Sequence, residues 1–169
     1  MIETWVLATD DWRLWRELRL AALAEAPGAF RSTLAGWSGT ADTEDRWRAR
    51  LDSVELNLVL ACDGRPAGMV SAVAPGAGRE AELISLWVAP GARGRGAGDE
   101  AIRQVLAWAR GQHHARVVLW VKAGNDHARA LYRRHGFVDA GPSPDDPTER
   151  LMLCERSAYA HGERWTMIT

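Results

Sequence analysis

The sequence has only two cysteines among its 169 residues, and the spacing of Cys62 and Cys154 fits no metal-binding or redox motif. Both lie in apolar, strand-like runs, so we expect buried free thiols in a reducing compartment. The first residues are not basic and no apolar segment follows them, which excludes a secretion signal. No apolar run approaches the ~18 residues that a membrane span needs. The sequence therefore predicts a cytoplasmic protein.

The sequence also has no excess of positive or negative charge, since the formal net charge is only −1. No overall field favours a nucleic acid or a membrane surface as partner. Histidine, cysteine and carboxylate residues form no cluster at metal-ligand spacing, so no metal site is expected. The composition, with 47% hydrophobic and 25% charged residues, is ordinary for a soluble protein, and the length suits a single domain over residues 1–169.

Tryptophan, in contrast, is abundant, with nine in the chain. Most of them fall on periodic apolar positions and are expected in the core. Trp37 and Trp47 lie in a more polar region, where they are candidates for lining a pocket instead.

Hydrophobic periodicity and turn residues predict the order β-α-α-β-β-β-α-β-α-β-β. The expected strands span 2–8, 56–62, 67–74, 81–88, 115–121, 137–140 and 151–154. The expected helices span 12–26 (capped by Thr9 or Asp10), 44–52 (capped by Thr43), 98–110 and 128–135 (capped by Asn125 or Asp126, and ended by Gly136). Turns are expected at 63–66 and 75–79, a loop or broken helix at 28–42, a turn-rich loop at 142–147, and the tail 157–169 is left unassigned.

The hairpins in this order imply antiparallel strand pairs, and the β-α-β unit over 81–121 implies a parallel, right-handed crossover. We therefore expect an α+β fold with a mixed, mostly antiparallel central sheet and helices on both faces.

The segment Val88-Ala-Pro-Gly-Ala-Arg-Gly-Arg-Gly-Ala-Gly98 joins the central strand to a helix. Exposed backbone N–H groups before a helix N-terminus form an anion site, and two arginines beside them favour phosphate. A Walker loop is excluded because Ala97 and Gly98 occupy its Lys and Ser/Thr positions. A dinucleotide fingerprint is excluded because its last glycine would be Asp99 or Ala101.

A third phosphate motif fits, because Arg93-Gly-Arg-Gly96-Ala-Gly98 matches [RQ]-x-x-G-x-[GA]. Leu83–Pro90 is similar to the strand that precedes this loop, and Asn125-Asp-His-Ala-Arg-Ala-Leu-Tyr132-Arg-Arg-His-Gly-Phe137 matches a second signature, N-x-x-A-x-x-L-Y-x-x-x-G-F. Together these motifs resemble the GNAT superfamily of acyl-CoA-dependent N-acyltransferases. The resemblance weakens before residue 55 and after residue 155.

The resemblance implies acetyl-CoA as the cosubstrate and a central strand that splays away from its parallel neighbour. The pantetheine arm enters the resulting gap and pairs with the main chain, while the glycine-rich turn cradles the pyrophosphate. The residues implied in cofactor binding are Leu86, Trp87, Val88, Arg93, Gly94, Arg95, Gly96, Ala97, Gly98 and Asn125. Which arginine side chain touches phosphate is left open, and Trp87 is expected mainly to pack.

Catalytic roles are assigned to Tyr132 and Glu82. Tyr132 follows Asn125 by nearly two helical turns, so both face one cleft, and its phenol is the expected acid for the leaving thiolate. Glu82 begins an apolar strand, where period two would place it on one face with Leu86 and Val88. Partial desolvation there would raise its pKa and suit it to act as the base.

Other residues have weaker assignments. Glu80 and Ser85 are the alternatives to Glu82 as base. His113 and His114 are expected at the surface, His127 and His135 near the adenosine phosphate, and Arg133 and Arg134 either at the nucleotide or in solvent. The region before residue 55 usually builds the acceptor site in this family. Its candidate residues are Trp12, Trp15, Arg19, Phe30, Arg31 and Trp37.

The function expected from these motifs is transfer of an acetyl group from acetyl-CoA to the primary amine of a small molecule, since the near-neutral charge argues against a nucleic acid or a large protein as acceptor. The alternatives are acetylation of protein N-termini or lysines, and a non-catalytic acyl-CoA-binding module. The sequence leaves the oligomeric state open, and a homodimer is one option.

Overall fold

The computed structural model describes residues 1–76 and 79–157 of the chain. The order of helices and strands is the predicted one, and the α+β class is confirmed. The elements are β1 (Ile2–Val6), α1 (Trp12–Glu25), α2 (Glu44–Asp52), β2 (Leu56–Cys62), β3 (Arg65–Val73), β4 (Glu80–Val88), α3 (Ala97–Gly111), β5 (Arg116–Lys122), α4 (Asp126–Arg134), β6 (Val138–Pro142) and β7 (Glu149–Glu155). Part of the turn expected at 75–79, and all but the first residue of the 157–169 tail, lie outside the described residues.

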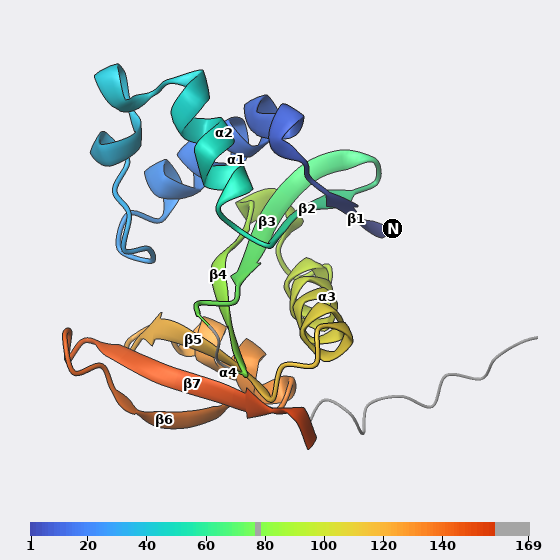
Figure 1. Ribbon diagram of the computed structural model, residues 1–169, viewed down its shortest axis with the longest axis vertical. Coiled ribbons are helices and arrows are strands. Elements are labelled where there is room, and N and C mark those ends of the chain that lie inside the picture. Colours follow the sequence, from blue (N-terminus) through green and yellow to red (C-terminus); the bar gives the residue numbers. More distant parts are fainter. Residues whose placement is uncertain (77–78, 158–169) are drawn as a thin grey trace, which may run out of the picture.

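All seven described strands form one sheet in the order β1-β2-β3-β4-β5-β7-β6. Every neighbouring pair is antiparallel except β4 and β5, which confirms the parallel crossover through α3. Strands β5, β7 and β6 run across the lower ends of β3 and β4, so the two halves of the sheet diverge (Figure 1).

The hairpin between β2 and β3 is tighter than the sequence suggested. Asp63 and Gly64 have φ angles of 51° and 76°, the left-handed pair that a two-residue hairpin turn requires. Strand β3 therefore begins at Arg65 and already contains Pro66, where a four-residue turn over 63–66 was expected.

Helices cover both faces of the sheet, as predicted, and each face has its own apolar core. Helix α3 buries one face, with Ile102 and Val105 fully enclosed against β2–β5. Helices α1 and α2 pack on the other face of β2–β4 (Figure 1). Trp15 and Trp47 are both 0% exposed in this second core.

The expectation that Trp47 lines a pocket is therefore wrong. Its ring is enclosed and its Nε1 donates a 2.8 Å hydrogen bond to Asp42. Trp37 packs against Trp47 with ring centroids 4.5 Å apart and ring planes tilted by 34°, and the Arg46 guanidinium lies over the Trp37 ring. Helix α2 turns Trp47 into the core, and Trp37 packs against that core from the short turn Ala35–Trp37 before the helix.

The predicted caps of the shorter helices are present. The Thr43 hydroxyl accepts a hydrogen bond from the backbone N–H of Arg46, which fixes the start of α2. The Asn125 amide oxygen accepts one of 3.1 Å from Ala128 at the start of α4. Gly136, with φ of 87°, follows the end of α4. These contacts fix the direction of α4 across the open end of the sheet.

Candidate active site

A β-bulge interrupts the central strand β4. Met69 of β3 pairs with Trp87 and Ser71 pairs with Ile84, so Ser85 and Leu86 together lie opposite a single β3 residue. Ser85 adopts φ of 58°, a conformation that few residues other than glycine take up.

The bulge adds one residue to β4, so side chains after it point to the opposite face from the one that regular alternation would give. Leu83 packs in the α3 core before the bulge, and Leu86 and Val88 pack against that same core after it. Trp87 packs in the α1/α2 core. The prediction that Glu82 shares a face with Leu86 and Val88 is therefore wrong, because Glu82 lies on the opposite face.

Strands β4 and β5 separate soon after they begin to pair. Their parallel register covers only Glu80–Glu82 against Arg116–Val118, although the strands continue to Val88 and Lys122. The splay expected from the resemblance is thus present. It leaves the β5-facing edge of the β4 main chain without a strand partner beyond Glu82, and these groups are available to a ligand.

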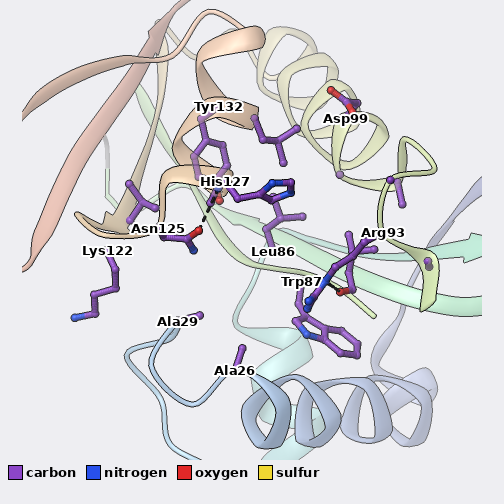
Figure 2. Close-up of a pocket in the computed structure, with 18 of the residues that line it drawn as sticks. Ala26, Ala29, Leu86, Trp87, Arg93, Asp99, Lys122, Asn125, His127 and Tyr132 are labelled. Atoms are coloured by element: carbon purple, nitrogen blue, oxygen red, sulfur yellow. Dashed lines mark hydrogen bonds between the residues drawn. The ribbon is translucent and has the colours of Figure 1, made fainter. Parts of the chain in front are cut away.

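The gap between the two strands opens into a cleft of about 760 Å³. The cleft brings together most of the predicted cofactor-binding residues, namely Leu86, Trp87, Val88, Arg93, Gly94, Gly96, Ala97, Gly98 and Asn125, together with Tyr132. Figure 2 shows His127 and Tyr132 of α4, and Asn125 just before this helix, on the side of the cleft across from Trp87 of β4. Arg95 does not line the cleft.

The glycine-rich turn presents a run of free donors at one end of the cleft. Among the residues that the structure describes, none accepts a hydrogen bond from the backbone N–H groups of 94–99. Gly94 and Gly96 have φ of 72° and 88°, and α3 begins directly afterwards at Ala97. Consecutive N–H groups at the positive end of a fifteen-residue helix have the geometry and charge to hold an anion such as pyrophosphate.

The two arginines of the turn point to different surroundings. Arg93 donates through Nε to the Val88 carbonyl oxygen at 3.0 Å and forms an ion pair of 2.8 Å with Glu25. Arg95 instead pairs with Asp63 of the β2–β3 turn. Of these two arginines, only Arg93 lines the cleft, which favours Arg93 over Arg95 for a side-chain contact with phosphate.

Tyr132 is 7% exposed and packs against Phe137, with ring centroids 5.8 Å apart. Its hydroxyl has no hydrogen-bond partner among the described residues, and burial raises the pKa of the phenol above its usual value of 10. The phenol is therefore protonated at neutral pH and free to donate. Asn125 lines the same cleft, as its spacing predicted.

A second, smaller cavity of about 250 Å³ adjoins the cleft on the α1/α2 side. The two cavities share Leu86, Trp120 and Tyr132, together with Ala29 and Phe30 from the segment after α1. The remaining walls of the second cavity include three arginines and two glutamates. These are Arg19, Arg31, Arg50, Glu82 and Glu149.

Glu82 lies in this second cavity and is half-buried. Burial raises the pKa of its carboxyl, and the positive charge of Arg31 opposes that rise in part. The alternatives are less suited to act as a base. Glu80 pairs with Arg116 at 3.2 Å, and the Ser85 hydroxyl accepts a 3.5 Å hydrogen bond from Arg50.

The acceptor candidates divide into two groups. Arg19, Phe30 and Arg31 line the second cavity. Trp12, Trp15 and Trp37 line neither cavity, because they belong to the core between α1, α2 and the sheet or pack against it.

Some of the histidines and arginines singled out in the sequence line the cleft and others do not. His127 and Arg134 border the cleft, and Arg134 and His135 both contact Asp99 at 2.9 Å. Arg133 is exposed and lines neither cavity. His113 and His114 lie after α3, away from both cavities.

Sequence reasoning missed Arg50, Trp120, Lys122 and Glu149. Arg50 is one of three arginines at alternate positions of α2, and nothing in the local pattern separates it from Arg46 and Arg48. Glu149 is only 5% exposed, although it follows a turn-rich segment in which a glutamate would be expected at the surface. Its partners Arg31 and Lys122 come from distant segments, so only the folded chain brings them together.

A model of the Acetyltransferase (GNAT) family matches residues 15–137 of the sequence. The chain belongs to this family of acyltransferases. A mycothiol acetyltransferase from Clavibacter sepedonicus is 35% identical over 132 residues. That match covers 78% of this chain but only 41% of the relative, so the chain spans less than half the length of that protein.

Solved structures share the fold of this GNAT chain. A putative acetyltransferase from Salmonella typhimurium, solved with acetyl-CoA, has a TM-score of 0.72 at 16% identity and covers 100% of this chain and 98% of its own. An N-acetyltransferase from Thermoplasma acidophilum, solved with coenzyme A, also has 0.72 at 14% identity, covering 92% and 99%. The ribosomal-protein-S18-alanine N-acetyltransferase of Escherichia coli has 0.66 at 22% identity, covering 99% and 100%.

In residues 1–76 and 79–157, no helix is long and apolar enough to cross a membrane. The same ranges contain no group of three histidine, cysteine or carboxylate side chains arranged to hold a metal ion.

Proposed function

We propose that this chain transfers an acetyl group from acetyl-CoA to the primary amine of a small molecule, and that residues 1–169 act as one catalytic domain in the cytoplasm. The observation that supports this most strongly is the position of Tyr132, at the junction of the cleft and the second cavity. Donor and acceptor would meet at that junction, where the structure offers a protonated phenol.

The cleft fits the donor. The free N–H groups of 94–99 would hold the pyrophosphate, with Arg93 at its side. The pantetheine arm would run along the unpaired edge of β4 from Val88 toward Leu86, where main-chain donors can polarise the thioester carbonyl. Asn125, already bonded to Ala128 through its amide oxygen, retains its NH₂ group for the arm.

The transfer then needs one proton removed and one supplied. The amine nitrogen attacks the thioester carbonyl carbon, the new C–N bond forms, and the C–S bond breaks. Glu82, on the acceptor side, would take the proton from the amine, directly or through a water molecule. Tyr132 would give its proton to the departing sulfur, and the two residues exchange protons with solvent afterwards.

The size and walls of the second cavity favour a small acceptor. At about 250 Å³, with charged side chains around it, the cavity suits a compact polar molecule better than an extended peptide. A protein acceptor would need an open groove leading to Tyr132. A non-catalytic module would not need a partner-free phenol where the two cavities meet.

The proposal is tested by measuring acetyl-CoA-dependent thiol release over a panel of small amines and short peptides. We expect turnover with small amines, and a loss of about 10²-fold or more in kcat for Glu82→Gln with coenzyme A affinity retained. Glu80→Gln, which removes the neighbouring carboxylate paired with Arg116, is the matched control and should keep its activity. Coenzyme A binding without thiol release on any acceptor would overturn the proposal.

A further inference from the structure

The second cavity contains two guanidinium groups that have no carboxylate partner in the described chain. Arg19 of α1 is 7% exposed, and its Nη1 is enclosed without any hydrogen-bond partner among the described residues. Its guanidinium lies over the Phe30 ring, 4.6 Å from the ring centroid.

Arg50 of α2 has partners, but all of them are neutral. Its guanidinium donates to the amide oxygen of Asn57 at 3.1 Å, and to the hydroxyls of Ser71 and Ser85 at 3.4 Å and 3.5 Å. Its charge is therefore left uncompensated beside that of Arg19, and the two guanidinium groups repel one another.

Burial lowers the pKa of both Arg19 and Arg50 to about 10, so both remain charged at neutral pH. Elsewhere the chain pairs partly buried arginines with carboxylates, as in Arg150 with Asp139 at 2.6 Å. An unpaired charge in a buried site is unfavourable unless a ligand supplies the counter-charge. The fork of a guanidinium matches the two oxygens of a carboxylate.

The same cavity also contains one carboxylate without a cation in contact. Glu82 has no hydrogen bond or ion pair within the described ranges, whereas Glu149 is already held by Arg31 and Lys122. Two guanidinium groups without a carboxylate partner, and one carboxylate without a paired cation, complement a molecule that has both an anionic and an amino group.

We infer that the acceptor is an amino carboxylate, whose carboxylate binds Arg19 and Arg50 while its amine lies toward Glu82 and Tyr132. This inference rests on the proposed acetyltransferase function and narrows its substrate class. In this arrangement the guanidinium groups of Arg19 on α1 and Arg50 on α2 bind the substrate carboxylate, and Glu82 on β4 accepts the proton of the amine.

The test compares standard amino acids with their α-amides, which keep the amine and lose the negative charge. We expect kcat/KM for the preferred acid to exceed that of its amide by at least about tenfold. Arg19→Met and Arg50→Met should raise KM for the acid by about 10- to 100-fold, change the amide little, and leave the affinity for coenzyme A unchanged. Arg19→Lys should restore part of the preference.

Arg13→Met is the matched control, since Arg13 is an exposed arginine of α1 outside both cavities and should keep the wild-type preference. Calorimetric binding of the acid to the coenzyme A complex tests the site without catalysis, and this binding should be lost in Arg19→Met.

Equal rates for acid and amide, or equal losses on both in the variants, would overturn the inference while the acetyltransferase function stands. Absence of turnover with every amine would overturn the function, and absence of calorimetric binding would overturn the inference.

Discussion

Tyr132→Phe separates catalysis from structure unusually well in this chain. The hydroxyl has no protein partner in the described ranges, so its removal leaves no buried group unsatisfied. The phenyl ring keeps its contact with Phe137 at 5.8 Å. We therefore expect the free energy of unfolding to change by less than about 1 kcal/mol.

The effect on turnover should be much larger. General acid catalysis contributes about 10²–10⁴-fold, and a thiolate is a good enough leaving group to place this reaction near the lower limit. A 10²-fold fall in kcat corresponds to about 2.7 kcal/mol of lost transition-state stabilisation. Thiol release at saturating acetyl-CoA and amine measures this fall, and calorimetry should give an unchanged Kd for coenzyme A.

Phe137→Leu is the matched control for packing. Phe137 is 2% exposed and touches the tyrosine ring from the core side, so this variant should lose stability but keep kcat within a few-fold. The assignment of Tyr132 as the acid is refuted if Tyr132→Phe retains more than half of the wild-type kcat. It is also refuted if the loss in activity is matched by a loss in coenzyme A affinity.

Two further variants test the base and the glycine-rich turn. Arg31→Met removes the positive charge that opposes the raised pKa of Glu82, so the acidic limb of the pH profile of kcat/KM should move to higher pH; an unmoved limb would exclude Glu82 as the titrating base. Gly96→Ala places a Cβ at φ of 88°, which should destabilise the fold by about 1–2 kcal/mol in thermal unfolding and weaken coenzyme A binding. Gly91→Ala, whose Cβ would meet open space without positive φ, should do neither, and equal effects of the two alanines would contradict a role for the turn geometry.

Much of the fold follows from local sequence, because caps, periodicity and turn residues act over a few neighbours. Thr43 and Asn125 cap their helices as predicted, and the glycine-rich turn lies beside the cleft. The walls of the second cavity do not follow in this way. Arg19 and Arg50 belong to different helices and meet only through tertiary packing, so no local pattern distinguishes them from exposed arginines.

The bulge at Ser85 explains both the main error in the sequence interpretation and the arrangement of the site. A serine does not predict a positive φ angle, so the bulge at Ser85 could not be recognised from the sequence. Strict alternation of side chains therefore placed Glu82 on the same face of the strand as Leu86. The bulge is held from both faces, since Leu83 packs in the α3 core before it and Trp87 packs in the α1/α2 core after it, with its Nε1 bonded to Glu25. A regular β4 would move one of these side chains out of its core. The same irregularity that directs Leu86 toward the cleft therefore keeps Glu82 in the second cavity, and one strand lines both cavities.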